Sequence, residues 1–424
     1  MIRLTKMKTP DTRTAFEELD KHDALGAYRD KFDLPGNIVY LDGNSLGALP
    51  HGVAERLRRV VEREWGTDLI TSWNKHGWMD LPSRVGARIA PLIGAEPSEV
   101  VCADSTSVNV FKTLSAALEL NPGRNVILSD SGNFPTDLYM AQGISRLLSD
   151  RPSGRVELKV VDETELESSV DENTAVVMAT HVNYRTGRRH DMQALTRTAH
   201  EQGALMFFDL AHSAGAMPIE LDRLGVDFAV GCGYKYLNGG PGAPAFLYVA
   251  RQHAQRFRPP LSGWLGHEAP FDFDLQYRPA EGIDRNRVGT PPILSMVALD
   301  AALDVFDDVD MHTVREKSLR LGELFQQRVE HTCGPLGVEL AGPRPAEQRG
   351  SQVSFRHGHA YPIMQALIER GYIGDFRAPD ILRFGFAPLY IRYVDVWDTA
   401  EALREILENE SWNQSRFKAR AKVT

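Results

Sequence analysis

The sequence predicts an α/β fold in which helices cover a mostly parallel sheet, giving three layers. From about residue 90, short apolar runs alternate with helical patterns, which is typical of such a sheet. Polar residues directly follow several of these runs, where ligands collect at the carboxyl ends of parallel strands. The chain has 424 residues, so two domains are expected rather than one.

The first expected element is an amphipathic helix over residues 51–65, where apolar side chains recur at helical spacing. Buried strands are expected at the apolar runs 126–128, 156–161, 175–179, 204–208, 228–230 and 245–249. Helical patterns separate several of these strands, at 107–120, 137–148 and 191–202. This order of elements is what predicts the parallel pairing.

The second half of the chain changes character. Residues 255–292 are rich in Pro, Gly and aromatic residues and are expected to be irregular. A long helical stretch is expected from Pro292 through residues 319–329, followed by a smaller α/β pattern that ends in a helix near 395–408. We therefore expect a large domain at 51–300, a small α/β domain at 301–424, and residues 1–50 packed with the small domain.

Composition limits the classes of partner. The net charge is −9, which argues against sequence-independent nucleic-acid binding and against attraction to an anionic membrane. The start of the chain has no apolar core of a signal peptide, and no stretch approaches the ~20 apolar residues of a membrane span. The three cysteines, Cys102, Cys232 and Cys333, form no close pair, which fits a reducing cytoplasm.

The most informative pair is Asp209 and Lys235. Asp209 ends an apolar run, and Lys235 lies in a glycine-rich turn 26 residues later (235 − 209). A lysine amine can form a Schiff base with pyridoxal 5′-phosphate (PLP), and a carboxylate can keep the pyridine nitrogen of this cofactor protonated. Either residue alone is common, so the hypothesis depends on the neighbouring motifs.

Two further segments fit a cofactor and also fit local structure. The segment 104–107, Asp-Ser-Thr-Ser, precedes a helix and suits a phosphate, although plain N-capping is the commoner reason for such a segment. In the segment 133–137, Phe134 can stack on a flat ring and Asp137 can reach a ring substituent, whereas a Pro turn that caps the next helix is the alternative.

His212 follows Asp209 by three residues and can orient it or contact the cofactor. Arg383 lies in an apolar segment, where a buried guanidinium needs a partner. A substrate carboxylate and an internal salt bridge are both candidates for that partner. Dinucleotide and P-loop motifs are absent from the sequence, and His357 and His359 lack further ligands, so no metal is expected.

Seven segments together resemble the kynureninase family, within the fold-type-I, PLP-dependent aminotransferase superfamily. The resemblance extends from about residue 34 to residue 412 and is especially to the bacterial enzymes. The segments are 40–47, 72–74, 133–139, 180–184, 208–215, 233–242 and 262–264. A cysteine desulfurase would share the Asp, His and Lys pattern but not this set.

The resemblance implies a role for each matching residue. It assigns the Schiff base to Lys235 and the pyridinium nitrogen to Asp209, with Tyr234 as a further catalytic candidate. The cofactor contacts that it implies are those of Thr106, Ser107, Phe134, Asp137, Thr180, Asp209, His212, Tyr234, Lys235, Trp264 and Thr290. Trp264 and Thr290 match residues that come from the partner subunit of a homodimer with active sites at the interface. Arg383, Trp73 and Asn44 match substrate contacts.

The implied reaction is the PLP-dependent hydrolysis of L-kynurenine to anthranilate and L-alanine, with 3-hydroxykynurenine as a poorer substrate. This reaction belongs to the kynurenine pathway of tryptophan catabolism, which also serves NAD biosynthesis. The alternatives are another fold-type-I PLP enzyme, such as a cysteine desulfurase or an aminotransferase, and a non-enzymatic PLP-binding regulator. A desulfurase needs a mobile nucleophilic cysteine, and Cys333 is the one loop-like candidate.

Overall fold

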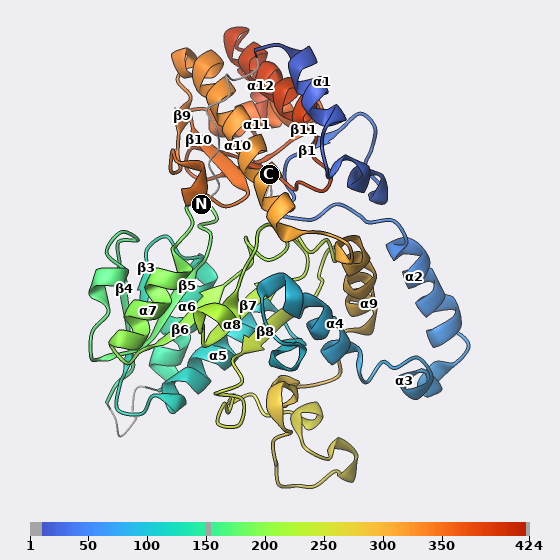
Figure 1. Cartoon of the computed structure of the whole chain (residues 1–424), viewed down its shortest axis with the longest axis vertical. Helices are drawn as coiled ribbons and strands as arrows, with labels where there is room; N and C mark the ends of the chain where they lie inside the picture. The colour runs from blue at the N-terminus through green and yellow to red at the C-terminus, as the bar shows by residue number, and fades with distance from the viewer. Residues whose placement is uncertain (1–10, 149–153, 421–424) are drawn as a thin grey trace. The chain divides into compact units, whose positions relative to one another are not determined.

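The computed structural model describes residues 11–148 and 154–420. The chain forms two compact units (Figure 1). The terminal unit comprises Met1–Ala48, Arg185–Arg188 and Asp308–Thr424, and the central unit comprises Leu49–Tyr184 and Arg189–Asp307. The segment 1–10, for which the sequence predicts no signal peptide, lies outside the described residues.

The central unit is built on a seven-stranded sheet with the strand order β2-β8-β7-β6-β5-β3-β4. Five neighbouring strands, β7, β6, β5, β3 and β4, pair in parallel, whereas β8 runs antiparallel to both β7 and β2. The expected mostly parallel sheet is therefore confirmed. Its strands are β2 (Val100–Cys102), β3 (Val126–Asp130), β4 (Glu157–Val161), β5 (Thr174–Thr180), β6 (Leu205–Asp209), β7 (Phe228–Cys232) and β8 (Ala245–Val249).

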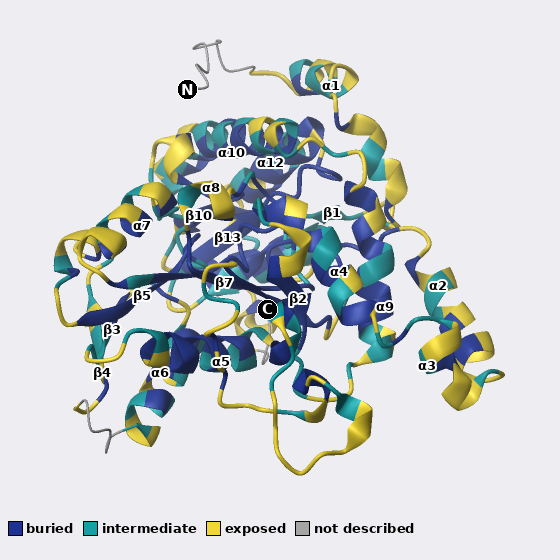
Figure 2. Ribbon diagram, turned by 60° about the horizontal axis from the view of Figure 1, so that its bottom comes forward, coloured by how far each residue is buried: buried dark blue, intermediate teal, exposed yellow. Residues whose placement is uncertain are grey.

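Helices cover both faces of this sheet. In Figure 2, α5 and α6 lie on one side of the strands, and α7 and α8 lie on the other. Leu114 of α5 belongs to the same buried core cluster as Phe207 of β6 and Phe228 of β7. The helices are α2 (Val53–Arg59), α3 (Ser72–Lys75), α4 (Leu81–Ile89), α5 (Thr106–Leu120), α6 (Pro135–Leu147), α7 (Met192–Glu201), α8 (Leu221–Leu224) and α9 (Ile293–Ala302).

Short helical turns account for much of the remaining chain of this unit. The helix expected at 51–65 is α2, which continues as the π-helical turn η2 (Val60–Trp65). The excursion expected at 255–292 is irregular apart from the 3₁₀ turns η7 (Trp264–Gly266), η8 (Pro270–Asp272) and η9 (Gly282–Asn286). Further 3₁₀ turns are η3 (Leu69–Thr71), η4 (Ala90–Ile93), η5 (Pro97–Glu99), η6 (Glu167–Ser169) and η10 (Leu303–Phe306).

The helical stretch expected from Pro292 through 329 is wrong as one continuous segment. It consists of α9, the turn η10 and a separate helix α10 (Met311–Cys333). The interruption has a local cause, because the carboxylate of Asp310 accepts hydrogen bonds from the N–H groups of His312 (3.2 Å) and Thr313 (2.9 Å). An aspartate in this position starts a new helix rather than continuing an old one.

The terminal unit contains a four-stranded antiparallel sheet, in the order β12-β13-β10-β9, and a two-stranded parallel sheet of β1 and β11. Its strands are β1 (Val39–Tyr40), β9 (Glu339–Leu340), β10 (Gln352–Arg356), β11 (Tyr372–Ile373), β12 (Asp375–Arg377) and β13 (Ile381–Gly385). Its helices are α1 (Arg13–Lys21), α10, α11 (Ala360–Glu369), α12 (Tyr393–Glu408) and α13 (Ser415–Lys418), with the 3₁₀ turns η1 (Gly26–Lys31), η11 (Gly334–Leu336) and η12 (Ala346–Gln348).

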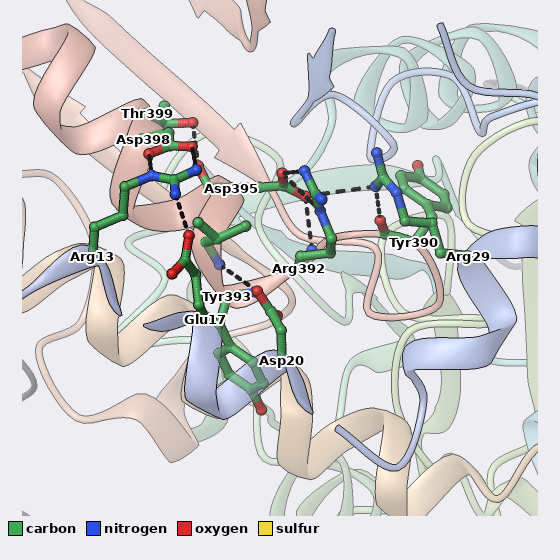
Figure 3. Close-up of polar contacts among 11 residues, drawn as sticks. Arg13, Glu17, Asp20, Arg29, Tyr390, Arg392, Tyr393, Asp395, Asp398 and Thr399 are labelled. Atoms are coloured by element: carbon green, nitrogen blue, oxygen red, sulfur yellow. Dashed lines mark hydrogen bonds and ion pairs between the residues drawn. The ribbon is translucent and has the colours of Figure 1, made fainter. Parts of the chain in front are cut away.

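Polar contacts join the amino-terminal segment to α12 inside the terminal unit (Figure 3). Arg13 donates to both carboxylate oxygens of Asp398, at 2.7 Å from Nε and 2.9 Å from Nη2. Asp20 accepts from the backbone N–H groups of Tyr393 (2.6 Å) and Val394 (3.0 Å). Since the first N–H groups of a helix have no partner within the helix, Asp20 caps α12 from a distant part of the sequence.

No helix in the described part of the chain is long and apolar enough to cross a membrane.

Candidate active site

The carboxyl ends of three parallel strands bring the first site residues together. Thr180 ends β5, Asp209 ends β6 and Cys232 ends β7. The register pairs Thr180 with Asp209, and Asp209 with Val230. The convergence that the sequence predicts at this edge of the sheet is therefore present, as expected for the ligand-binding edge of an α/β fold.

Lys235 lies in the tight turn that follows β7. Its Nζ is 2.9 Å from Nε2 of His212, which comes three residues after Asp209. The turn is closely packed, because a Cβ atom on Gly233 would lie only 2.5 Å from the carbonyl oxygen of Pro244. A larger residue at this position would displace the turn and move the lysine amine.

Aromatic rings flank the same amine. Nζ of Lys235 lies 6.0 Å from the ring centre of Phe134 and 5.8 Å from that of Tyr234. The ring of Phe134 meets Tyr184 edge to face at 5.2 Å, and 39% of the residue is exposed. A face of Phe134 thus remains accessible to a flat ligand, which is the geometry that stacking requires.

Asp209 and Asp137 form a buried carboxyl pair, 3% and 2% exposed. Burial, followed by the charge of Asp209 and a hydrogen bond to it, raises the pKa of Asp137 well above its usual range. Burial also raises the pKa of Asp209, but the charge of Lys235 and the hydrogen bonds from Ala211 and Asp137 oppose this effect. We infer that the pair holds one proton, on Asp137, and that Asp209 carries the negative charge.

Asn133 orders the segment before α6. Its Oδ1 accepts hydrogen bonds from the N–H of Phe134 (2.7 Å) and from Oγ1 of Thr180. Its Nδ2 donates to Oγ of Ser129 at 2.9 Å. These bonds fix the entry into α6 and therefore the directions in which Phe134 and Asp137 project.

A cavity of about 700 Å³ lies at the N-terminus of α5. Thr106 and Ser107 line it, together with Tyr234 and Thr290. Burial raises the pKa of the Tyr234 phenol above its usual value, so this hydroxyl keeps its proton at neutral pH. Hydroxyl groups and free N–H groups at a helix N-terminus are suited to a phosphate.

The residues present fit both the phosphate group and the pyridine ring of PLP. The cavity at α5 offers hydroxyl groups for the phosphate, and the charged Asp209 offers a partner for a protonated ring nitrogen. No group of three or more His, Cys, Asp or Glu side chains in the described chain is arranged to hold a metal ion.

Arg383 belongs to a buried charge cluster in the terminal unit. Its Nε donates to Oδ1 of Asp375 at 2.7 Å, its Nη2 also contacts Oδ2 of that carboxylate, and Nη2 donates to Oγ of Ser45 at 2.7 Å. Arg377 donates to Asp375 as well, at 2.7 Å. Although burial opposes it, the charge of Arg383 lowers the pKa of Asp375 below its usual range. The internal salt bridge considered for Arg383 from the sequence is thus present.

Asn44 lies in the same unit and is fully buried, with Nδ2 3.3 Å from Oε1 of Gln352. A Cβ atom on Gly385 would lie 1.9 Å from Oδ1 of Asn44, so only a glycine leaves room for this amide. Neither Trp73 nor Trp264 lines the cavity at α5. Trp73 meets Trp78 edge to face at 5.7 Å, and Trp264, which is 41% exposed, meets Phe271 in the same way at 5.7 Å.

The interpretation of Cys333 as a loop-like residue is wrong. Cys333 ends α10 and is fully buried, and burial raises the pKa of its thiol to about 11. Cys102 and Cys232 are buried too. A nucleophilic cysteine needs an accessible thiolate, and none of the three offers one.

Sequence reasoning missed three charged residues near these sites. Lys112 is fully buried in α5 and bonds to Asp104, and Asp42 belongs to the cluster around Arg383. Asp375 is the third. A lysine inside the otherwise uncharged run 106–118 was the available signal for Lys112. The partners of Arg383 gave no comparable signal, because Ser45 and Asp375 are 330 residues apart.

A lysine beside a buried aspartate at the carboxyl edge of a parallel sheet, with a phosphate-type cavity nearby, defines the class of fold-type-I PLP-dependent enzymes. Comparisons with known proteins agree. Residues 314–403 match the kynureninase C-terminal domain, and residues 87–220 match the DegT/DnrJ/EryC1/StrS aminotransferase family. The chain belongs to the kynureninase family.

Relatives cover nearly the whole chain. A kynureninase of Burkholderia mallei is 52% identical over 99% of this chain and 100% of its own length, and one of Pseudomonas fluorescens is 49% identical over 97% and 100%. Among solved structures, the cysteine desulfurase of Thermococcus onnurineus has a TM-score of 0.72 at 20% identity, covering 90% of this chain and 98% of its own. A cysteine desulfurase of Escherichia coli has a TM-score of 0.73 at 20% identity, covering 91% and 98%. These structures show the fold.

The charge cluster generates a prediction about stability and pH. Burial and the charge of Asp375 raise the pKa of Asp42 from 3.8 to about 7, against the opposing charge of Arg383. The folded protein therefore holds this proton more tightly than the unfolded chain. The resulting stabilisation is complete below pH 3.8 and is lost as the pH rises through about 7.

Asp42→Asn cannot ionise and removes this dependence. The quantity of interest is the unfolding free energy of the variant minus that of the wild type. We expect this difference to be roughly 1 to 3 kcal/mol more favourable to the variant at pH 8 than at pH 5. Denaturant unfolding of both proteins at the two pH values measures this. Asp30→Asn, at an exposed aspartate of the same unit, is the control. An equal difference at pH 5 and pH 8 for Asp42→Asn would contradict the assignment.

Proposed function

We propose that this chain hydrolyses L-kynurenine to anthranilate and L-alanine with PLP as cofactor. One observation carries the reaction: proteins named kynureninase match the chain over 99% of its length at 52% identity. The geometry around Lys235 and Asp209 supports the cofactor independently. The proposal places the enzyme in tryptophan catabolism.

Three residues of the central unit have different proposed roles in proton transfer. When bound, PLP withdraws electrons from the substrate Cα and so makes the Cα proton removable. Lys235 would hold the cofactor through Nζ, and the same amine, once free, would be the base that takes the Cα proton. Asp209 would favour a proton on the ring nitrogen through its negative charge, and the hydrogen bond from Asp137 would support that charge.

Cleavage of the Cβ–Cγ bond consumes one water molecule, which adds to the side-chain ketone before the bond breaks. Tyr234 is the candidate proton donor and acceptor in these steps, since its phenol is protonated at neutral pH and its ring centre is 5.8 Å from Nζ of Lys235. Its place in the lining of the cavity at α5 equally suits a contact with the cofactor phosphate. Both roles are compatible with one hydroxyl group.

Arg383 is proposed to bind the α-carboxylate of the substrate. Its partner Asp375 fixes the plane of the guanidinium through two bonds, as in other bidentate arginine–carboxylate pairs. The internal salt bridge and the substrate contact are therefore compatible, with Asp375 orienting the group that meets the substrate. Asn44 and Trp73 are the further proposed substrate contacts.

A desulfurase or an aminotransferase is the less supported alternative. The solved desulfurases share the fold at 20% identity, which carries no argument about the reaction. The three cysteines are buried, so the nucleophilic thiol that a desulfurase needs is not supplied by any of them.

We also propose a cytoplasmic homodimer with active sites at the subunit interface. Several large apolar side chains are strongly exposed in the single chain, among them Leu69 (62%), Ile70 (78%), Phe271 (61%), Phe273 (74%) and Leu275 (100%). Exposed apolar surface of this kind marks association sites. Sedimentation equilibrium of the purified protein is expected to give twice the mass of the chain, and a monomer at micromolar concentration would contradict the proposal.

The function is tested by incubating the purified protein with PLP and L-kynurenine and following anthranilate fluorescence. Lys235→Ala is expected to fold, because the residue is only partly buried and does not belong to the core. It should lose the visible absorbance of the lysine-bound cofactor and essentially all turnover. A variant that keeps this absorbance after dialysis would show that Lys235 does not hold the cofactor. A wild type without anthranilate release would contradict the reaction itself.

Substrate choice is proposed to depend on Trp73. Its indole is mainly apolar, so it should stack on the substrate ring and leave a ring hydroxyl without a polar partner. We expect a higher kcat/KM for L-kynurenine than for 3-hydroxy-L-kynurenine, with a smaller ratio in Trp73→His. Steady-state rates with both substrates measure the ratio. If Trp73 is only a packing partner of Trp78, the substitution leaves the ratio unchanged and the assignment is contradicted.

A further inference from the structure

Lys112 carries a fully buried ammonium group in the second turn of α5. Its helical neighbours Val110 and Leu114 are buried apolar residues. Burying a charge in such surroundings is costly unless a partner of opposite charge compensates it. The proposed reaction uses no charge at this position, so the reaction itself does not account for the buried ammonium group.

The ammonium makes two hydrogen bonds. Nζ donates to Oδ2 of Asp104 at 2.7 Å and to the carbonyl oxygen of Asn286 at 2.8 Å. Asp104 lines the cavity at α5, and Asn286 directly precedes the lining segment 287–290. Lys112 therefore connects two stretches of chain that form walls of the same cavity. The sequence separates its two partners by 182 residues (286 − 104).

The backbone at Asp104 is held in an uncommon conformation. Its φ is +53°, a region that residues other than glycine enter only at a cost. The carbonyl oxygen of Asp104 accepts a hydrogen bond from the N–H of Ala245 at 2.9 Å. Together with the bond to Lys112, this contact fixes the turn that leads into Thr106 and Ser107.

Asp104 also presents an electrostatic problem. Its side chain is 26% exposed and lines the cavity beside the hydroxyl groups that suit a phosphate. An uncompensated carboxylate there would repel a phosphate dianion, and the repulsion would be strong because the surroundings have a low dielectric constant. Lys112 is the cation paired with it. Burial lowers the pKa of Lys112, and the charge of Asp104 opposes this effect.

We propose that Lys112 is a positioning residue for the cofactor phosphate: it neutralises Asp104 and ties the two cavity walls together, so that the N-terminus of α5 accepts a dianion. The inference rests on the proposed function, since PLP is the ligand that brings the phosphate. Lys112 acts through Asp104 and Asn286 and does not itself contact the ligand.

The phosphate contribution is measured by comparing two ligands. The full-length protein, freed of cofactor, is titrated with PLP and with pyridoxal, which lacks the phosphate, and the ratio of the two dissociation constants is determined. In Lys112→Met we expect this ratio to fall at least tenfold while the affinity for pyridoxal changes less than twofold. Lys159→Met, at a half-exposed lysine of β4, is the control and should keep the wild-type ratio.

A double variant separates charge from folding. Lys112→Met combined with Asp104→Asn leaves no charge at either position, so only the loss of the tie between the walls remains, and its ratio is expected to lie within threefold of the wild type. If Lys112→Met does not fold, as judged by circular dichroism, the double variant decides alone, and a tenfold loss there overturns the inference. A ratio that stays unchanged in a folded Lys112→Met, or an equal loss for both ligands, also overturns it.

The wild-type protein tests the phosphate site, and the Lys112→Met variant tests the role of Lys112. A wild type that binds PLP no more tightly than pyridoxal contradicts the phosphate site, and this inference falls with it. A wild type that prefers PLP, with a Lys112→Met variant of the same preference, leaves the cofactor site intact and removes only the role of Lys112.

Discussion

The central constraint on this structure is the cost of keeping the charge of Asp209 inside the protein. A buried carboxylate remains ionised only if neighbouring groups compensate for lost hydration. Here a lysine, a backbone N–H group and a protonated carboxyl group act on the same side chain. The parallel sheet makes this possible, because it ends several strands at one edge and leaves their loops to supply the compensating groups. The compensation of this buried charge thus depends on how β5, β6 and β7 end.

The terminal unit also buries a charge that neighbouring groups must compensate, but here the charge is positive. Arg383 is 1% exposed; the carboxylate of Asp375 balances its charge, Ser45 accepts a hydrogen bond from it, and burial together with the charge of Asp375 raises the pKa of Asp42. Both units therefore place a fully buried charge next to a carboxyl group that holds its proton unusually tightly. A protonated carboxyl group lets the local charge be adjusted without another basic residue, which is why such pairs are found at functional sites.

The sequence predicts β3 to β8 and the carboxyl edge well, because apolar runs and the polar residues after them are local signals, whereas the three-residue β2 was not expected. Asp209, Thr180 and Lys235 could be placed together for that reason. The break before α10 was missed, since the capping bonds of Asp310 decide it and apolar residues continue at intervals on both sides. The pairing of Asp104 with Lys112 and that of Asp375 with Arg383 were also missed, because a charge partner is chosen in space and leaves no periodic pattern. The roles of Trp73 and Trp264 came from family resemblance, and the geometry of the single chain adds no contact between either of them and the cavity.

The discontinuous terminal unit has a consequence for the order of assembly during synthesis. The chain leaves the ribosome from its amino end, so residues 11–48 emerge hundreds of residues before their partners in 308–424. Asp20 cannot cap α12 until residues 393–408 of that helix have been made. The central unit is nearly continuous and can fold first, as domains generally do. Until α12 has been synthesised, the apolar face of α1 therefore has no partner. In the folded protein Phe16 of this face contacts Trp397, with the ring centres 5.2 Å apart.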